Sequence, residues 1–207
     1  MTATVVVSPT VAHPRRMVTS MEPQATDLAP PVRYAVVDVE TSGLRADRHR
    51  VLQVGVVVVD AQGNVVDRWS SLVRPRHRWW YRVGPVHVHG IRRRDVRAAP
   101  PAGDVLRRLA VMLEGTQFVA HNAGFDAAFL RRAAAREGLT LSLGEPLCTL
   151  RLSRQLDPQR QLSHRLGDVA ARYGIALVHP HDALADAEAT AAILPHLLRA
   201  SAEVTAA

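Results

Sequence analysis

Four acidic residues and one histidine stand in three short motifs, and they are the residues of this chain best suited to chemistry. The motifs are VVDVETSGL at 36–44, VAHNAGFDAAFL at 119–130 and HDALADAEAT at 181–190. The five residues are Asp38, Glu40, Asp126, His181 and Asp186. Each motif sets a carboxylate or an imidazole beside apolar sequence, where an uncompensated charge is unfavourable. The pattern therefore predicts a site that binds a positively charged group.

Asp38 and Glu40 are two residues apart at the end of an apolar, strand-like segment, so both side chains are expected on the same face. Two carboxylates about 4 Å apart repel by about 4 kcal/mol at an effective dielectric constant of about 20. A divalent cation removes that repulsion, and oxygen ligands without cysteine favour Mg²⁺ or Mn²⁺ over a structural zinc. The alternative is an exposed strand end with two solvated acids, but the flanking valines indicate burial.

The other three residues are predicted on or beside helices. Asp126 falls in the first turn of a helix, where a lone acid would simply favour the helix dipole. His181 and Asp186 are five residues apart, about 140° around a helix, so they cannot face one point from a continuous helix. We therefore expect His181 in the loop after Pro180. A histidine there suits a general base, although a plain surface histidine beside His179 is the alternative.

Charge is concentrated in one stretch of the chain. All 26 basic side chains are arginine, and eight of them lie between Arg74 and Arg97 against one acid, Asp95. Such a patch attracts polyanions, because several phosphates can be neutralised at once. The run Trp79-Trp80-Tyr81 within it suits stacking on unpaired bases, unless these rings pack beneath the loop. His87 and His89 have no third ligand nearby and are not expected to bind a transition metal.

The chain is expected to hold one folded domain of about 33–200, between a disordered leader (1–32) and a short tail (201–207). Whether translation starts at Met1, Met17 or Met21 stays open. No apolar run reaches the roughly 20 residues that span a bilayer. No secretory signal is expected, because no positive charge precedes the short apolar patch at the N-terminus. With a single cysteine the chain can form no internal disulfide, which agrees with a cytoplasmic location.

Hydrophobic periodicity and turn residues predict an α/β fold with a mixed five-stranded sheet flanked by helices. The strands are expected at 34–38, 51–60, 65–73, 118–120 and 147–152. The helices are expected at 104–114, 122–136, 163–173 and 182–199. Asn122 is expected to cap the second helix, and 74–101 is expected to be a loop.

The three motifs resemble the DEDDh branch of the 3′–5′ exonucleases, which includes polymerase proofreading subunits, ribonuclease T and oligoribonuclease. The resemblance implies a ribonuclease H-like fold and two bound ions, Mg²⁺ or Mn²⁺. It implies that Asp38, Glu40 and Asp186 hold one ion, and that Asp38 with Asp126 helps to hold the second. His181 would deprotonate the attacking water. A histidine rather than a tyrosine at this position distinguishes the DEDDh branch from its tyrosine-containing sibling branch.

The resemblance also implies where the 3′ end of a nucleic acid would bind. Thr41 and Leu44 would contact the terminal nucleotide, and His89 lies in a segment that the family places near the substrate groove. Asn122 and Phe125 recur at the family's spacing. The expected partner is a single-stranded DNA or RNA 3′ end, with DNA favoured and nucleoside 5′-monophosphates released. An RNA-trimming oligoribonuclease and a non-catalytic nucleic-acid-binding module stay open.

Two further expectations concern what differs from the family. Cys148-Thr149 replaces an Asp-Thr pair found in many relatives, at a position without a catalytic role. Few residues follow the last helix, where the family's proofreading subunits generally continue into a polymerase-binding tail, and this disfavours a dedicated replisome subunit. A homodimer and an association with a polymerase both stay open.

Overall fold

The computed structural model describes residues 33–75 and 82–206, so the expected leader and the run Trp79-Trp80-Tyr81 lie outside the described residues. Within them the strands are β1 (Arg33–Thr41), β2 (Val51–Val59), β3 (Val65–Leu72), β4 (Thr116–Ala120) and β5 (Leu147–Cys148). The helices are α1 (Val86–His89), α2 (Arg93–Ala98), α3 (Ala102–Leu113), α4 (Ala123–Arg136), α5 (Thr149–Gln155), α6 (Leu166–Arg172) and α7 (Ala183–Ala206).

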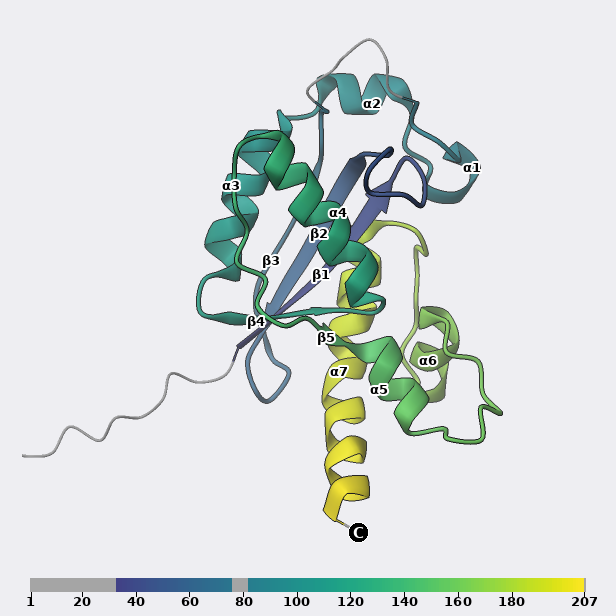
Figure 1. Cartoon of the computed structure of the whole chain (residues 1–207). Coiled ribbons are helices and arrows are strands. Elements are labelled where there is room, and N and C mark those ends of the chain that lie inside the picture. Colours follow the sequence, from purple (N-terminus) through teal and green to yellow (C-terminus); the bar gives the residue numbers. More distant parts are fainter. Residues whose placement is uncertain (1–32, 76–81, 207) are drawn as a thin grey trace, which may run out of the picture. The chain divides into compact units, whose positions relative to one another are not determined.

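The strands form one mixed sheet in the order β3-β2-β1-β4-β5 (Figure 1). β1, β2 and β3 run as an antiparallel meander, and β4 and β5 join the other side of β1 in parallel. The expected mixed five-stranded sheet is therefore confirmed. No helix of the described residues is long and apolar enough to cross a membrane.

Helices cover both faces of this sheet (Figure 1). Val37 and Val39 of β1 pack with α3 and α4, whereas Val36 packs with α7 on the opposite face. Side chains alternate along a strand, so Asp38 and Glu40 share the α7 face with Val36. This alternation is what directs both acids toward the start of α7.

Gly55 lets the start of α7 approach the sheet at backbone distance. It lies opposite Asp38 in the β1–β2 pair. A Cβ added to Gly55 would lie 2.1 Å from the carbonyl oxygen of Ala183, the first residue of α7. Any side chain at position 55 would therefore push α7 away from the acids on β1.

The expected loop at 74–101 is wrong in part, because α1 and α2 lie within it. At the start of α2 the Arg92 N–H donates to Asp95 Oδ2 at 2.7 Å. Val96 of α2 is buried with Ile91 and Leu52. A local cap and a small apolar cluster thus stabilise a helix inside an arginine-rich segment.

Three other boundaries also differ from the expectation. The strand predicted at 147–152 stops at Cys148, because its partner β4 ends at Ala120. The helix predicted from 163 begins at Leu166, after a loop in which Asp157 accepts backbone N–H groups. α7 continues past Arg199 to Ala206. Asn122 directly precedes α4, but its side chain makes no capping hydrogen bond.

Replacing Gly55 by alanine is predicted to destabilise the protein by about 1–3 kcal/mol, because the added methyl group meets immobile backbone. Urea unfolding measures the change in the free energy of unfolding. Gly124→Ala is the matched control, since a Cβ there has no atom within 4 Å and lies in a helix. Equal stability of the two variants would contradict the close contact between β2 and α7.

Candidate active site

A cleft of about 460 Å³ lies at the C-terminal end of β1. Every residue predicted to take part in catalysis or to bind the terminal nucleotide lines this one cleft. The acids and the candidate base that line it are Asp38, Glu40, Asp126, His181 and Asp186. The expected substrate contacts that line it are Thr41, Leu44, His89, Asn122 and Phe125. The fold thus brings together residues from β1, α1, α4 and the start of α7.

Asp38 and Glu40 lie where the electrostatic environment disfavours negative charge. Burial raises the pKa of Asp38 well above its usual value, and the charges of Asp126, Asp186 and Glu40 raise it further. The pKa of Glu40 is raised to about 7, first by burial and then by the charges of Asp186 and Asp182. Without a cation, burial and the neighbouring charges thus both disfavour the ionised form of this pair.

Asp126 fills the place where β4 no longer pairs with β1. The parallel register between the two strands ends at Val36 and Val119. Beyond it, the Val39 N–H donates to Asp126 Oδ1 at 3.2 Å. Burial raises the pKa of Asp126 to about 7, although backbone hydrogen bonds partly oppose that rise. The first turn of α4 is thereby fixed against the strand that carries Asp38.

His181 lies in the turn before α7 with a positive φ of 67°, and Asp186 lies in the first turn of that helix. The His181 N–H donates to Asp186 Oδ2 at 3.1 Å. Single ligand atoms from Glu40, His181 and Asp186 lie within 4.8 Å of one another. The turn thus solves the geometric problem that a five-residue spacing would pose on a continuous helix.

The donor set fits a hard divalent cation. Asp186 Oδ1 is buried, and no group of the described residues hydrogen-bonds to it. Burial also raises the pKa of Asp186. A buried acceptor without a partner is unfavourable, and an ion next to it would remove that penalty. Carboxylate oxygens are the ligands that Mg²⁺ and Mn²⁺ prefer.

Gln53 and Asp182 hold the start of α7 on the sheet, and neither was predicted from the sequence. Asp182 Oδ1 accepts the N–H groups of Leu184 and Ala185, each at 3.1 Å. Gln53 Nε2 donates to Asp182 Oδ2 at 2.8 Å, and Gln53 lies opposite Glu40 in the β1–β2 pair. An aspartate before an apolar helix is a known capping signal that could have identified Asp182. The partner on β2 had no local signal.

Three histidines line the cleft, but two of them use both ring nitrogens. His89 Nδ1 accepts the Ile91 N–H at 3.0 Å, so its Nε2–H donates to the Val83 carbonyl, also at 3.0 Å. His121 is bound in the same way, by the carbonyl oxygen of His164 and the hydroxyl of Thr149. The ring of His181 makes no hydrogen bond to the rest of the described chain. Among the cleft histidines, His181 is thus the one whose ring is not committed to hydrogen bonds within the described residues.

The expected substrate contacts differ in how they are held. Leu44 is 83% exposed, which is unusual for a leucine and leaves its side chain facing the open cleft. Thr41 is buried, and its hydroxyl donates to the Gly43 carbonyl at 2.8 Å. The centroids of the Phe125 and Phe129 rings lie 4.7 Å apart, so Phe129 packs against Phe125 and supports it. The cleft therefore offers apolar surfaces beside its acids.

The arginine-rich stretch lies next to the cleft. Its described arginines are exposed apart from Arg74, which is half-buried. α1 lines the cleft with Val88 and His89, and α2 follows it directly. Gly84 lies against the Ser42 carbonyl, because a Cβ at Gly84 would lie 2.4 Å from that oxygen. Arg76 and Arg78 lie outside the described residues.

Comparison with known proteins connects this site to a family. A family model described as an exonuclease, RNase_T, matches residues 35–194. The chain is 33% identical over 170 residues to a PolC-type DNA polymerase III of Streptococcus agalactiae, covering 82% of this chain and 11% of the relative. A PolC-type enzyme of Lactococcus lactis is 34% identical over 161 residues, covering 78% and 10%. The chain thus spans about a tenth of the length of these relatives.

Solved structures support the fold. E. coli Exonuclease I in complex with a dT13 oligonucleotide superposes with a TM-score of 0.72 at 19% identity, covering 84% of this chain and 43% of that one. The zinc-bound form of an E. coli ExoI–ssDNA complex gives 0.70 at 20% identity, covering 82% and 42%. The sheet and its flanking helices are therefore a ribonuclease H-like fold.

The family model spans most of the chain and all five residues of the three motifs, so the chain belongs to the exonuclease family. Within that family, its four acids and His181 follow the spacing of the DEDDh branch, the 3′–5′ exonucleases. Membership of the exonuclease family implies dependence on divalent metal ions, which agrees with the donor set of the cleft.

The raised pKa values predict how the metal-free protein responds to pH. Glu40 and Asp126 titrate near 7 in the folded state, well above the ordinary values near 4 of unfolded carboxyls. Between these values the folded state binds more protons than the unfolded state, so this contribution to stability falls as pH rises. Thermal unfolding in EDTA between pH 5 and 8 measures it.

Asp38→Asn is the control for that experiment, because it removes one half-buried charge from the cluster. We expect this variant to melt a few degrees higher than wild type at pH 8 in EDTA, and to differ less at pH 5. The comparison with wild type is needed because the lowered pKa values of His89 and His121 act in the opposite direction. An equal difference at both pH values would contradict the predicted charge repulsion.

Proposed function

We propose that this chain is a divalent-metal-dependent 3′–5′ exonuclease that hydrolyses single-stranded nucleic acid, with DNA favoured, and releases nucleoside 5′-monophosphates. The observation that carries the proposal is the single cleft lined by four carboxylates and by an imidazole with unengaged ring nitrogens. The unpartnered oxygen of Asp186 supports an ion in that cleft.

Asp38, Glu40 and Asp186 would hold one Mg²⁺ or Mn²⁺ ion, and Asp38 with Asp126 would hold a second. Bound in this way, divalent cations stabilise the charge on the attacking and leaving oxygens of an in-line phosphoryl displacement. Asp126 would supply its carboxylate from α4, whereas Asp186 would supply its own from α7. The hydrogen bond from the Val39 N–H restrains the Asp126 side chain in that position.

His181 would act as the general base by accepting a proton from the attacking water at a ring nitrogen. Its backbone hydrogen bond to Asp186 holds it beside the acids, while its side chain is exposed and can reach solvent. His89 and His121 are not available for this role, since their rings are bound on both sides. They would shape the cleft instead.

Leu44 would pack against the terminal base, with Phe125 forming a second apolar surface and Thr41, Asn122 and His89 bordering the nucleotide. Bases reach such surfaces when they are unpaired, which favours a single strand. The DNA oligonucleotides in the Exonuclease I complexes support DNA over RNA here. Resemblance to PolC-type polymerases supports a role in proofreading beside a polymerase.

The decisive assay uses single strands of DNA and RNA labelled at the 5′ end, with Mg²⁺, Mn²⁺ or EDTA. We expect metal-dependent shortening from the 3′ end, faster on DNA. Asp38→Asn should reduce cleavage below detection, because its carboxylate serves both ions. His181→Gln should lower kcat by about 10²–10⁴-fold, as loss of a general base does.

His179→Gln is the matched control for His181→Gln, since it removes an exposed histidine two residues away that does not line the cleft. Calorimetry of Mn²⁺ binding distinguishes a general base from a metal ligand at position 181. We expect His181→Gln to leave the Mn²⁺ affinity unchanged, because a general base does not hold the ion. Binding without shortening in every metal condition would show a non-catalytic module, and faster loss of short RNA would show an oligoribonuclease.

We also propose that the exposed arginines of α2 neutralise phosphates of the strand that enters the cleft. Arg94→Gln with Arg97→Gln should reduce the slope of log affinity against log salt by about 0.7 for each phosphate that the protein no longer neutralises. Arg199→Gln on α7 is the control for a charge removed outside this cluster. A slope that does not change in the double variant would show that α2 does not face nucleic acid.

A further inference from the structure

The connection between β1 and β2, residues 42–50, is held by hydrogen bonds within it. At its base the Ser42 N–H donates to the Arg50 carbonyl at 2.9 Å, and the Arg50 N–H donates to Ser42 Oγ at 3.0 Å. Within it the His49 N–H donates to the Arg45 carbonyl at 2.7 Å, and the Arg45 N–H donates to His49 Nδ1 at 3.0 Å. The connection is therefore a closed loop with a tight turn, rather than a loose link.

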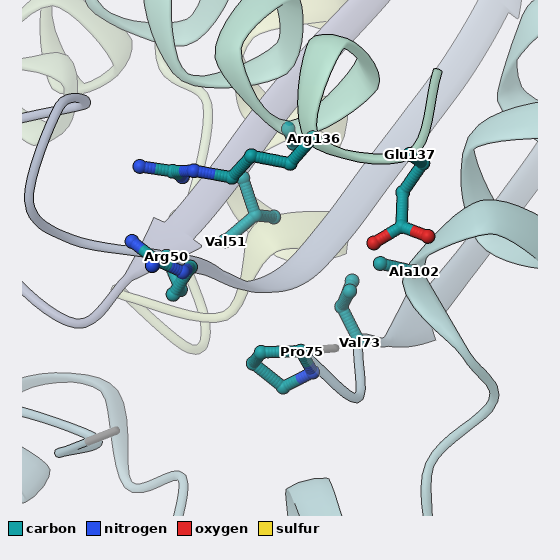
Figure 2. A pocket seen from close by; sticks show the side chains of 8 residues that line it. Arg50, Val51, Val73, Pro75, Ala102, Arg136 and Glu137 are labelled. Atoms are coloured by element: carbon teal, nitrogen blue, oxygen red, sulfur yellow. The ribbon is translucent and has the colours of Figure 1, made fainter. Parts of the chain in front are cut away.

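Arg136, in the last turn of α4, ties this loop to the helix. Its guanidinium donates to the carbonyl oxygens of Ala46 at 2.9 Å, Asp47 at 2.8 Å and His49 at 3.0 Å. Figure 2 shows its side chain extending from the helix along a small pocket toward Arg50. A guanidinium offers donors in a rigid planar fork, so three carbonyl contacts fix the loop relative to α4.

Both α4 and the loop that Arg136 joins to it contribute residues to the cleft. The first turn of α4 carries Phe125 and Asp126, and the loop carries Leu44. Leu44 is so exposed that its side-chain contacts cannot determine where it lies, and its position follows from the loop backbone. Gly43 adds to this restraint, because a Cβ there would lie 2.5 Å from the His49 ring.

We propose that Arg136 is a positioning residue for the 3′ end of the substrate. By fixing residues 42–50 on α4, it holds Leu44 at a set distance from Asp126 and the other acids. The inference rests on the proposed function, because that function gives Leu44 its contact with the terminal nucleotide. Arg136 itself borders the small pocket of Figure 2 and does not line the cleft.

Steady-state cleavage of a single-stranded DNA oligonucleotide tests the proposal. Arg136→Gln should raise KM about tenfold and change kcat by less than about twofold, since it loosens substrate placement without touching the acids. Arg132→Gln is the matched control, because it removes the same charge from an exposed position of the same helix. An equal KM in the two variants would overturn the proposal.

A double-mutant cycle with Leu44→Ala distinguishes positioning from direct contact. If Arg136 acts through Leu44, Arg136→Gln should raise KM by less than about twofold in the Leu44→Ala background. If Arg136 instead contacts phosphate, the same substitution should raise KM equally in both backgrounds and flatten the salt dependence, which would also overturn the proposal.

Amide hydrogen exchange gives a readout that does not depend on activity. In Arg136→Gln we expect faster exchange at Arg48 and His49, and in Arg132→Gln no change. If Arg136→Gln does not fold, Arg136→Lys keeps the charge but replaces the planar fork, whose two nitrogens contact the three carbonyls, by a single nitrogen, and it should show the same changes. An inactive wild type would refute the proposed function, whereas an active wild type with unchanged exchange in the variant would refute the Arg136 inference alone.

Discussion

Repulsion between buried and half-buried carboxylates is the interaction on which this site depends. Asp38, Glu40, Asp126 and Asp186 all line one cleft, and burial raises the pKa of all four. For Asp38 and Glu40 the neighbouring negative charges raise the pKa further. Such an arrangement is unfavourable for the folded protein unless protons or cations compensate the charge. The same repulsion that lowers the stability of the metal-free fold favours the binding of divalent ions, because a bound cation relieves it.

The acids stay together because the elements that carry them are joined by contacts between distant parts of the chain. Asp126 is fixed to β1 through the Val39 N–H. The start of α7 is fixed by Gln53 and Asp182, and it approaches closely because position 55 is a glycine. The far end of α4 is joined to the β1–β2 loop by the guanidinium of Arg136. Helix, strand and loop therefore behave as one support around the cleft.

The same packing determines which of the cleft histidines keeps ring nitrogens free of hydrogen bonds to the described chain. His89 and His121 lie in the cleft, but their ring nitrogens hold the backbone around Val83 and His164. They help to form the walls, and their protons are committed to that role. His181 comes from a turn rather than from a packed element, so its ring keeps access to water and to the acids.

Local patterns allowed much of this fold to be predicted. Valine-rich strands, turn residues and glycine helix stops indicated the mixed sheet and most helices. The predictions failed at 74–101, where helices form within arginine-rich sequence, and at 147–152, where the strand ends because its neighbour ends. In both cases the outcome depended on an apolar cluster or a strand partner elsewhere in the chain.

The sequence alone determined the chemical groups of the site and their local geometry. Strand periodicity put Asp38 and Glu40 on one face, and helical periodicity required a turn between His181 and Asp186. Tertiary structure decided which groups are buried, which imidazole keeps its nitrogens, and which residues support the site. The hydrogen bonds that support the acids join residues 87 and 129 positions apart, and those that engage the His121 ring join residues 28 and 43 positions apart. No local pattern encodes such partners.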